Sequence, residues 1–148
     1  MKNYFLYSIF SIILCFNIHA TEFGTKEEAE NMLERAVNIL KLDKSLALEL
    51  FAEGEGGFIY KDLYTLCYHI SSGTMYSHPT LTGLSREKSV SEGVNVADLI
   101  VKNATEGKVS SVNVKVPRFT TGDTKIFDKT LLVTKLEDLA CAVGFYKK

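Results

Sequence analysis

The sequence predicts an α+β domain, in which helices gather on one side of an antiparallel sheet. Apolar residues recur at helical spacing through residues 25–53, whereas aromatic and β-forming residues dominate from Phe58 onward. The strands follow one another after the helices instead of alternating with them, and this order favours antiparallel pairing. A segment of loop and helix, residues 80–107, interrupts the run of strands.

The first twenty residues have the layout of a secretory signal peptide. Lys2 gives a basic start, residues 4–16 form an apolar run, and Ala20 is a small residue before a polar stretch. We expect cleavage after Ala20, leaving residues 21–148 as one periplasmic or secreted domain that is not embedded in a membrane. The alternative is an uncleaved membrane anchor, which the shortness of the apolar run disfavours.

Two helices should open the domain. Thr25 lies three residues before Glu28, the spacing of a capping box, and an apolar stripe follows it. A second helix should begin near Asp43 and end at the glycine-rich stretch 54–57, where glycine leaves the helical conformation at little steric cost.

A hairpin should follow the helices. Residues 62–70 and 74–78 are strand-like and are joined by Ser71, Ser72 and Gly73. Pro79 lacks a backbone donor and should end the second strand. Residues 80–93 are expected to form a long loop, and such loops are often functional in compact domains.

The last part of the domain should contain one helix and three strands. The helix is predicted over 95–107, with Asn95 as its cap and Gly107 as its terminator. The strands are predicted over 108–116, 125–136 and 138–146, giving five strands in the sheet.

Composition and motifs exclude several functions. The net charge is −1 and no basic stripe is visible, so nucleic acid is not an expected partner. The sequence has no nucleophile elbow, phosphate-binding glycine loop or zinc-protease motif. We therefore predict a protein that is not an enzyme and has no cofactor. Cys67, His69 and Cys141 are an incomplete ligand set, and no metal site is predicted from them.

The order and spacing of several weak motifs resembles a known family. These motifs are "AVNILKLDKSLALELFAEGEGGFIYKDLY" (36–64), "SSGTMYSHPTLTGLS" (71–85), Lys129 in the fourth strand and "AVGFY" (142–146). Together they are similar to the single Cache domain of bacterial extracytoplasmic sensors. The resemblance implies a PAS-like sheet with a long N-terminal helix on one face. It also implies a pocket on the other face, often for short carboxylates, covered by the loop and helix segment.

The resemblance and the residue chemistry together give a candidate ligand site. Lys129 matches the family's strand lysine and would give an anion a charge-assisted contact, although an exposed strand lysine is the commoner case. His78 would donate to a carboxylate from the pocket rim, or would simply pack beside Pro79. Tyrosines would supply walls with polar tips, or would be ordinary core residues. The candidates are Tyr64, Tyr68, Tyr76, His78, Arg118 and Lys129, of which Arg118 ranks lower because it lies at a strand end.

The chain departs from the resemblance in its third strand. Family members often have aromatic residues there, whereas this chain has Ser110, Ser111 and Asn113. We therefore expect a wider or more polar pocket. A PAS-like strand order would make the first and last strands neighbours, so that Cys67 and Cys141 could form a disulfide. Two buried free thiols are the favoured alternative.

These expectations combine into a functional hypothesis. The chain would be a stand-alone sensor or binding component for a small anionic metabolite, in a signal-transduction process such as chemotaxis. A membrane receptor or another protein would be its partner. Two alternatives remain, namely a protein-interaction module with a degenerate pocket and a membrane-anchored sensor fragment.

Overall fold

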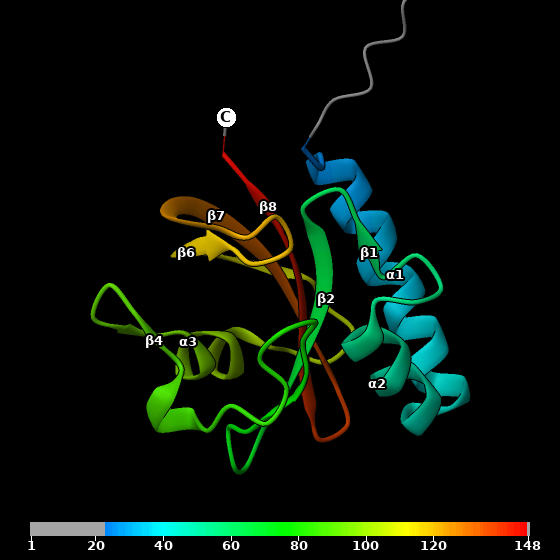
Figure 1. Cartoon of the computed structure of the whole chain (residues 1–148). Coiled ribbons are helices and arrows are strands. Elements are labelled where there is room, and N and C mark those ends of the chain that lie inside the picture. The colour runs from blue at the N-terminus through cyan, green and yellow to red at the C-terminus, as the bar shows by residue number, and fades with distance from the viewer. Residues whose placement is uncertain (1–22, 148) are drawn as a thin grey trace, which may run out of the picture.

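A computed structural model describes residues 23–147, so the predicted signal peptide lies outside the described residues. Two helices open the fold, strands and a third helix follow, and three long strands close it (Figure 1). The elements are α1 (Lys26–Leu42), α2 (Lys44–Glu53), β1 (Ile59–Tyr60), β2 (Leu63–His69), β3 (Met75–Ser77), a short 3-10 turn (Arg86–Lys88), β4 (Val90–Ser91), β5 (Val94–Asn95), α3 (Val96–Asn103), β6 (Ser110–Arg118), β7 (Asp123–Leu136) and β8 (Leu139–Tyr146).

The main sheet has the PAS-like strand order that the resemblance implies. β2 pairs with β8, β8 with β7 and β7 with β6, all antiparallel, and β3 pairs with β2. The two-residue strand β1 also pairs with β2. The predicted α+β class and five-stranded antiparallel sheet are confirmed, and β1 is an addition that the sequence analysis missed.

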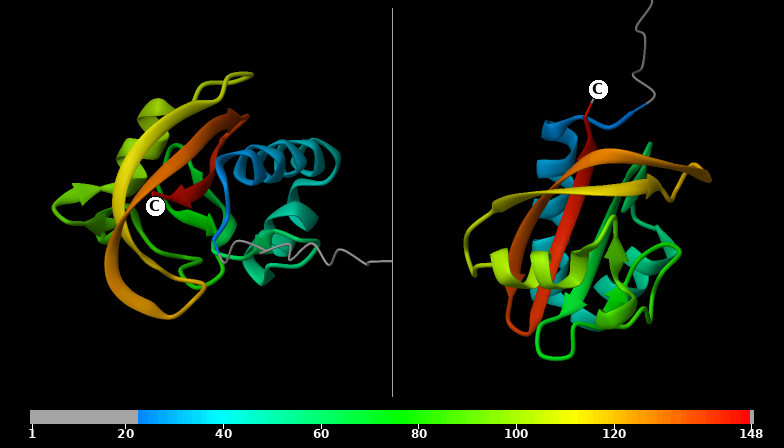
Figure 2. Two further views of the ribbon diagram at one scale, coloured as in Figure 1. Left: turned by 90° about the horizontal axis from the view of Figure 1, so that it is seen from above. Right: turned by 90° about the vertical axis from the view of Figure 1, so that its left-hand side faces the viewer.

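The helices α1 and α2 cover one face of the curved sheet (Figure 2). The capping box of Thr25 and Glu28 begins α1, and the Asp43 side chain caps α2. Their apolar faces pack against side chains of β2, β7 and β8, including Leu63, Leu132 and Val143. Burial on this face stabilises the sheet. Because side chains alternate along a strand, the residues between these positions face the opposite side of the sheet.

The opposite face is covered by α3 and by the chain between β3 and α3 (Figure 2). Side chains that alternate with the helix-facing set point to this side, among them Tyr64, Tyr68 and Leu131. Periodicity alone did not reveal which face of β2, the strand predicted over 62–70, packs against the helices. The packing assigns Leu63 and Cys67 to the helix face and the two tyrosines to the other.

Several predicted boundaries were wrong. The helix predicted over 95–107 ends at Asn103, because the chain then turns and forms an isolated bridge between Thr105 and Lys108 around Gly107. The predicted loop 80–93 contains a 3-10 turn and β4, and β4 forms a small hairpin with β5. The connection at 92–93 uses two residues with positive φ.

The expected effect of the third strand on the pocket is also wrong. Ser111 and Asn113 are exposed on β6 and point away from the covered face, on which Val112, Val114 and Val116 are buried instead. Since side chains alternate along a strand, Ser111 and Asn113 do not reach this face, and Ser110 lies outside the lining of the cavity described below.

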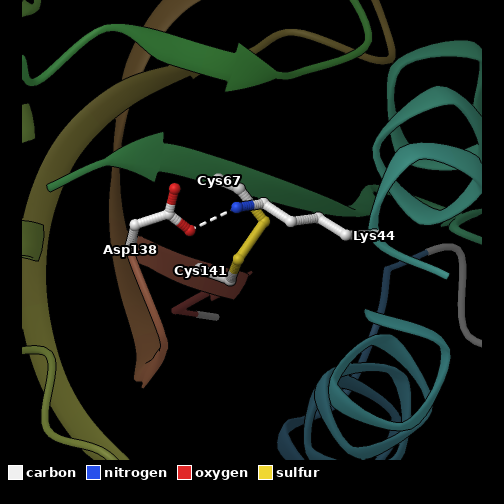
Figure 3. Close-up of a disulfide and its surroundings, with 4 residues drawn as sticks. All are labelled: Lys44, Cys67, Asp138 and Cys141. Carbon is white, nitrogen blue, oxygen red and sulfur yellow. Dashed lines mark hydrogen bonds and ion pairs between the residues drawn. A yellow bond between two sulfur atoms is a disulfide. The ribbon is translucent and has the colours of Figure 1, made fainter. Parts of the chain in front are cut away.

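Cys67 and Cys141 form a disulfide (Figure 3). They are direct partners in the register of β2 and β8, and the bond differs from the two free thiols that the sequence favoured. The bond also removes both sulfurs from any metal site. Lys44 of α2 forms an ion pair with Asp138 beside the disulfide, joining the second helix to the turn before β8 (Figure 3).

Candidate functional site

A cavity of about 330 Å³ lies between the sheet and the segment that runs from β3 to α3. The floor comes from β2, β6 and β7, and the covering segment, 75–96, is called the roof below. The lining residues are Tyr64, Leu66, Tyr68, Met75, His78, Leu81, Leu84, Lys88, Ser89, Val90, Ser91, Val96, Val114, Val116, Pro117, Phe119, Ile126, Lys129 and Leu131. Lys88, Val90 and Ile126 are exposed and mark the mouth.

Lys129 is the most unusual residue of the cavity. It lies on β7 between Val114 of β6 and Tyr146 of β8 in the sheet register, and its exposure is 0%. Its Nζ atom lies 3.8 Å from the centre of the Tyr64 ring and 4.5 Å from that of Tyr146. Among the described residues this atom has no hydrogen-bond partner. The aromatic rings offset only part of the cost of burying an ammonium.

Burial lowers the pKa of Lys129 from 10.5 to about 7, because the charged form is poorly solvated there. The buried carboxylate of Asp62 opposes this effect. The amine of Lys129 is therefore protonated less readily than that of an exposed lysine. An anion entering the cavity would favour the protonated form.

Gly144 makes room for the lysine side chain. A Cβ atom at this position would overlap Cε of Lys129 and Cδ2 of Leu131. The glycine of the "AVGFY" motif therefore has a steric role, since it lets the Lys129 side chain lie across β8 toward Tyr64.

His78 is a buried, neutral hydrogen-bond donor at one end of the cavity. Its Nδ1 atom accepts the backbone N–H of Thr80 at 3.1 Å, so that the neutral ring carries its proton on Nε2. Burial lowers the pKa of His78 to about 3, and the charge of Lys129 acts in the same direction. The ring contacts Tyr64 and Phe119 edge-on, at 4.7 and 5.2 Å between centroids. These contacts and the hydrogen bond to Thr80 hold the imidazole in one orientation.

Thr82 holds the exit of β3 that positions His78. Its hydroxyl donates to the His78 carbonyl and accepts the His78 N–H. Pro79 follows at the end of the strand, as the sequence predicted. The histidine is thus both a packing residue and a wall of the cavity, but it is buried and does not lie at the rim, where the sequence analysis placed it.

Two of the predicted tyrosines also line the cavity. The Tyr64 ring faces the Lys129 amine, and burial raises the pKa of the Tyr64 phenol well above its usual value. The Tyr68 hydroxyl is 2.6 Å from Oγ of Ser89, which joins the floor to the roof. Both phenols are neutral at ordinary pH and can serve as walls or donors.

The structure places Tyr76 and Arg118 outside the cavity lining. Tyr76 is 41% exposed and stacks on His69 at 5.0 Å, because it occupies the other face of the short strand β3. The Arg118 guanidinium lies against the rings of Phe23, Phe127 and Tyr146, 4.0 to 4.9 Å from their centres. It therefore joins the start of the described chain to the sheet.

Asp62 is a buried residue that sequence analysis missed. Its Oδ1 accepts the backbone N–H of Gly24 at 2.7 Å, and its Oδ2 lies 3.7 Å from Nε of Arg118. A carboxylate at the start of a strand is usually solvated, so nothing in the sequence marked it as buried. Asp62 acts on the pKa of Lys129 through its charge and does not line the cavity.

A second hollow, of about 620 Å³, lies between α1 and the end of β7. Most of its polar lining is exposed and solvated, including Glu30, Lys41 and Lys108. Although this hollow is larger, it contains no buried charge without a partner among the described residues. The cavity at Lys129 is therefore the better candidate for a specific site.

One comparison with known proteins gives a match, and it concerns the fold. No protein-family model matches the sequence, and no curated protein matches it. A similar solved structure is described as "Structural basis for carboxylic acid recognition by a Cache chemosensory domain". It is 18% identical, with a TM-score of 0.58, and the match covers 82% of this chain and 88% of the other.

The chain therefore has the fold of a Cache chemosensory domain, as the motif order indicated. Between residues 23 and 147, no helix is both long enough and apolar enough to cross a bilayer.

Proposed function

We propose that this protein is a non-enzymatic, extracytoplasmic domain that binds a small carboxylate in the cavity at Lys129. The observation that carries the proposal is the buried amine of Lys129, which faces the cavity without a hydrogen-bond partner among the described residues. An amine in this position costs stability, and an anionic ligand would supply the partner that the protein does not.

The groups around the amine suit one carboxylate. Lys129 would pair with one oxygen, and the Nε2–H of His78 can donate a second hydrogen bond. Tyr64 lies between them, since its ring contacts both the lysine amine and the imidazole. Such a site would bind an anion more tightly at a pH where Lys129 is protonated.

The same proposal includes a sensory role. A Cache fold, a predicted signal peptide at 1–20 and a roof hydrogen-bonded to the floor suit a domain that reports ligand binding to another protein. We infer that the mature domain, 21–148, is periplasmic or secreted, acts in signal transduction such as chemotaxis, and has a membrane receptor or another protein as its partner. The similar structure recognises carboxylic acids, which supports the proposed class of ligand.

Calorimetry and thermal unfolding test the proposal. The exported protein is titrated with a panel of mono- and dicarboxylates, amino acids and purines, alongside Lys129→Met and the control Lys125→Met. Lys125 is an exposed lysine of the same strand. We expect a carboxylate to raise the melting temperature of the wild type and of Lys125→Met, but not of Lys129→Met. At 100 times its dissociation constant, a ligand adds about 2.7 kcal/mol.

A flat response to every carboxylate would refute the proposal. The alternative of an interaction module with a degenerate pocket has less support, because the cavity is retained. The membrane-anchored alternative concerns residues outside the described range. Sequencing the N-terminus of the exported protein tests it, and a start at Thr21 would exclude an anchor.

A further inference from the structure

The polarity of the cavity is divided between its two ends. The charged and neutral donors Lys129 and His78 lie at the buried end, each at most 2% exposed. The remaining walls of the cavity are mainly apolar. They consist of Leu66, Met75, Leu81, Leu84, Val96, Val114, Val116, Phe119 and Leu131. A ligand that pairs with Lys129 must therefore place the rest of its structure against hydrocarbon.

The cavity offers no carboxylate partner for a ligand ammonium. None of its lining residues, all within the described part of the chain, is aspartate or glutamate. Asp62 is the nearest buried carboxylate that affects Lys129, but it accepts the Gly24 N–H, faces Arg118 and does not line the cavity. An α-ammonium would lie beside the Lys129 amine and would lose its hydration without gaining a counter-charge.

Most of the remaining polar groups are engaged or lie at the mouth. The hydroxyls of Tyr68 and Ser89 bond to each other, and Ser91 donates to the Lys115 carbonyl at 2.5 Å. Lys88 is exposed at the mouth, where a contact with a ligand would remain solvated and weak. The middle of the cavity therefore has few free polar groups with which to recognise a hydroxyl or an amide.

The volume sets the size of the ligand. A cavity of about 330 Å³ is at the lower end of the range for small-molecule sites. At the packing density of protein interiors it holds a ligand of roughly ten non-hydrogen atoms. Acetate would leave much of this apolar space unfilled.

We propose that the ligand is an apolar-tailed monocarboxylate without an ammonium group, such as a medium-chain, branched or aromatic acid, whose carboxylate lies at Lys129 and His78 and whose tail points to the mouth. This inference rests on the proposed function and specifies its ligand class. It separates these acids from α-amino acids and from the shortest carboxylates.

A matched series of ligands tests the inference by calorimetry at pH 6.5. Acetate, butanoate and hexanoate vary only the tail, norleucine adds an α-ammonium to hexanoate, and hexanamide removes the charge. Each buried CH₂ should improve affinity about fourfold, so that hexanoate binds at least about 100-fold more tightly than acetate. Norleucine should bind at least about 100-fold more weakly than hexanoate, and hexanamide at least about tenfold more weakly.

Two variants change the volume and leave the charge in place. Val116→Phe on the floor should weaken hexanoate at least about tenfold and leave acetate unchanged, because the larger ring occupies the tail region. Leu81→Phe on the roof provides a second test if the first variant does not fold. Far-ultraviolet circular dichroism identifies the folded variants.

The outcomes separate the two proposals. If acetate or norleucine binds as tightly as hexanoate, and Lys129→Met abolishes that binding, the ligand class is wrong but the carboxylate site stands. If no carboxylate binds, both proposals fail. If folded Val116→Phe or Leu81→Phe loses affinity for acetate and hexanoate equally, the placement of the tail is also contradicted.

Discussion

Replacement of Lys129 by Met should stabilise the ligand-free protein at neutral pH. Methionine has a similar length, fits between Tyr64 and Tyr146, and has no charge to desolvate. Lys129 has a folded-state pKa of about 7, whereas its ordinary value is 10.5. At pH 7 this difference corresponds to a cost of about 4 kcal/mol in the free energy of unfolding of the wild type. Since the lowered pKa already includes the attraction between the rings and the ammonium, the variant should gain up to about 4 kcal/mol.

The pH dependence gives a sharper test than the difference at one pH. Between pH 7 and 10.5 the unfolded chain binds more protons at this lysine than the folded chain does, so the free energy of unfolding of the wild type should rise with pH. The slope should approach about 1.4 kcal/mol per pH unit. The cost of burial is fully present below pH 7 and is lost as the pH approaches 10.5. Lys129→Met lacks this contribution.

Urea unfolding between pH 6 and 10 measures both quantities for the wild type, Lys129→Met and the control Lys125→Met. The control should follow the wild type, because Lys125 is exposed. The difference between the wild type and Lys129→Met should shrink as the pH rises. Parallel pH profiles for these two proteins would show that the amine is solvated or paired, and would refute the buried, unpartnered state on which the ligand site depends.

Three further predictions concern other parts of the site and its support. Gly144→Ala should destabilise the protein by about 1–3 kcal/mol and weaken carboxylate binding in calorimetry, because the new methyl overlaps Lys129; unchanged affinity would show that the lysine side chain does not need this space. Reduction of the Cys67–Cys141 bond, which spans 74 residues, should lower the free energy of unfolding by about 4 kcal/mol, and equal urea midpoints with and without reductant would contradict this. Burial lowers the pKa of His78 from 6.5 to about 3, so the free energy of unfolding of the wild type should fall as the pH falls from 6.5 toward 3. In urea unfolding, His78→Asn should lose less of its free energy of unfolding over this range. Identical acid profiles of the two proteins would argue against a buried neutral imidazole.

The sequence predicted the parts of the site that have a local signature. A histidine before proline at a strand end and two tyrosines on one face of a strand were recognisable from the residues, whereas Lys129 was named because of the family resemblance. Lys129, His78, Tyr64 and Tyr68 line one cavity. The α+β class followed from helical and strand periodicity because these patterns reflect burial on one face.

The features that were missed depend on tertiary placement. Tyr76 was expected at the site, but the alternation of a three-residue strand turns it to the solvent side. Asp62 is buried only because Gly24 and Arg118 meet it from distant parts of the chain. The expected polar third strand failed for a similar reason, since the register with β7 turns Val114 to the cavity and Asn113 to water.

The crosslink between the first and last long strands has a mechanical consequence. Cys67 lies on the same strand as Tyr64, and Cys141 on the same strand as Gly144 and Tyr146, so one covalent bond braces both strands beneath the lysine. The opposite side of the cavity has no disulfide among the described residues. Beyond the pairing of β3 with β2, it meets the floor through hydrogen bonds such as the one from Ser91 to the Lys115 carbonyl. Ligands of different size should therefore displace the roof and leave the floor in place.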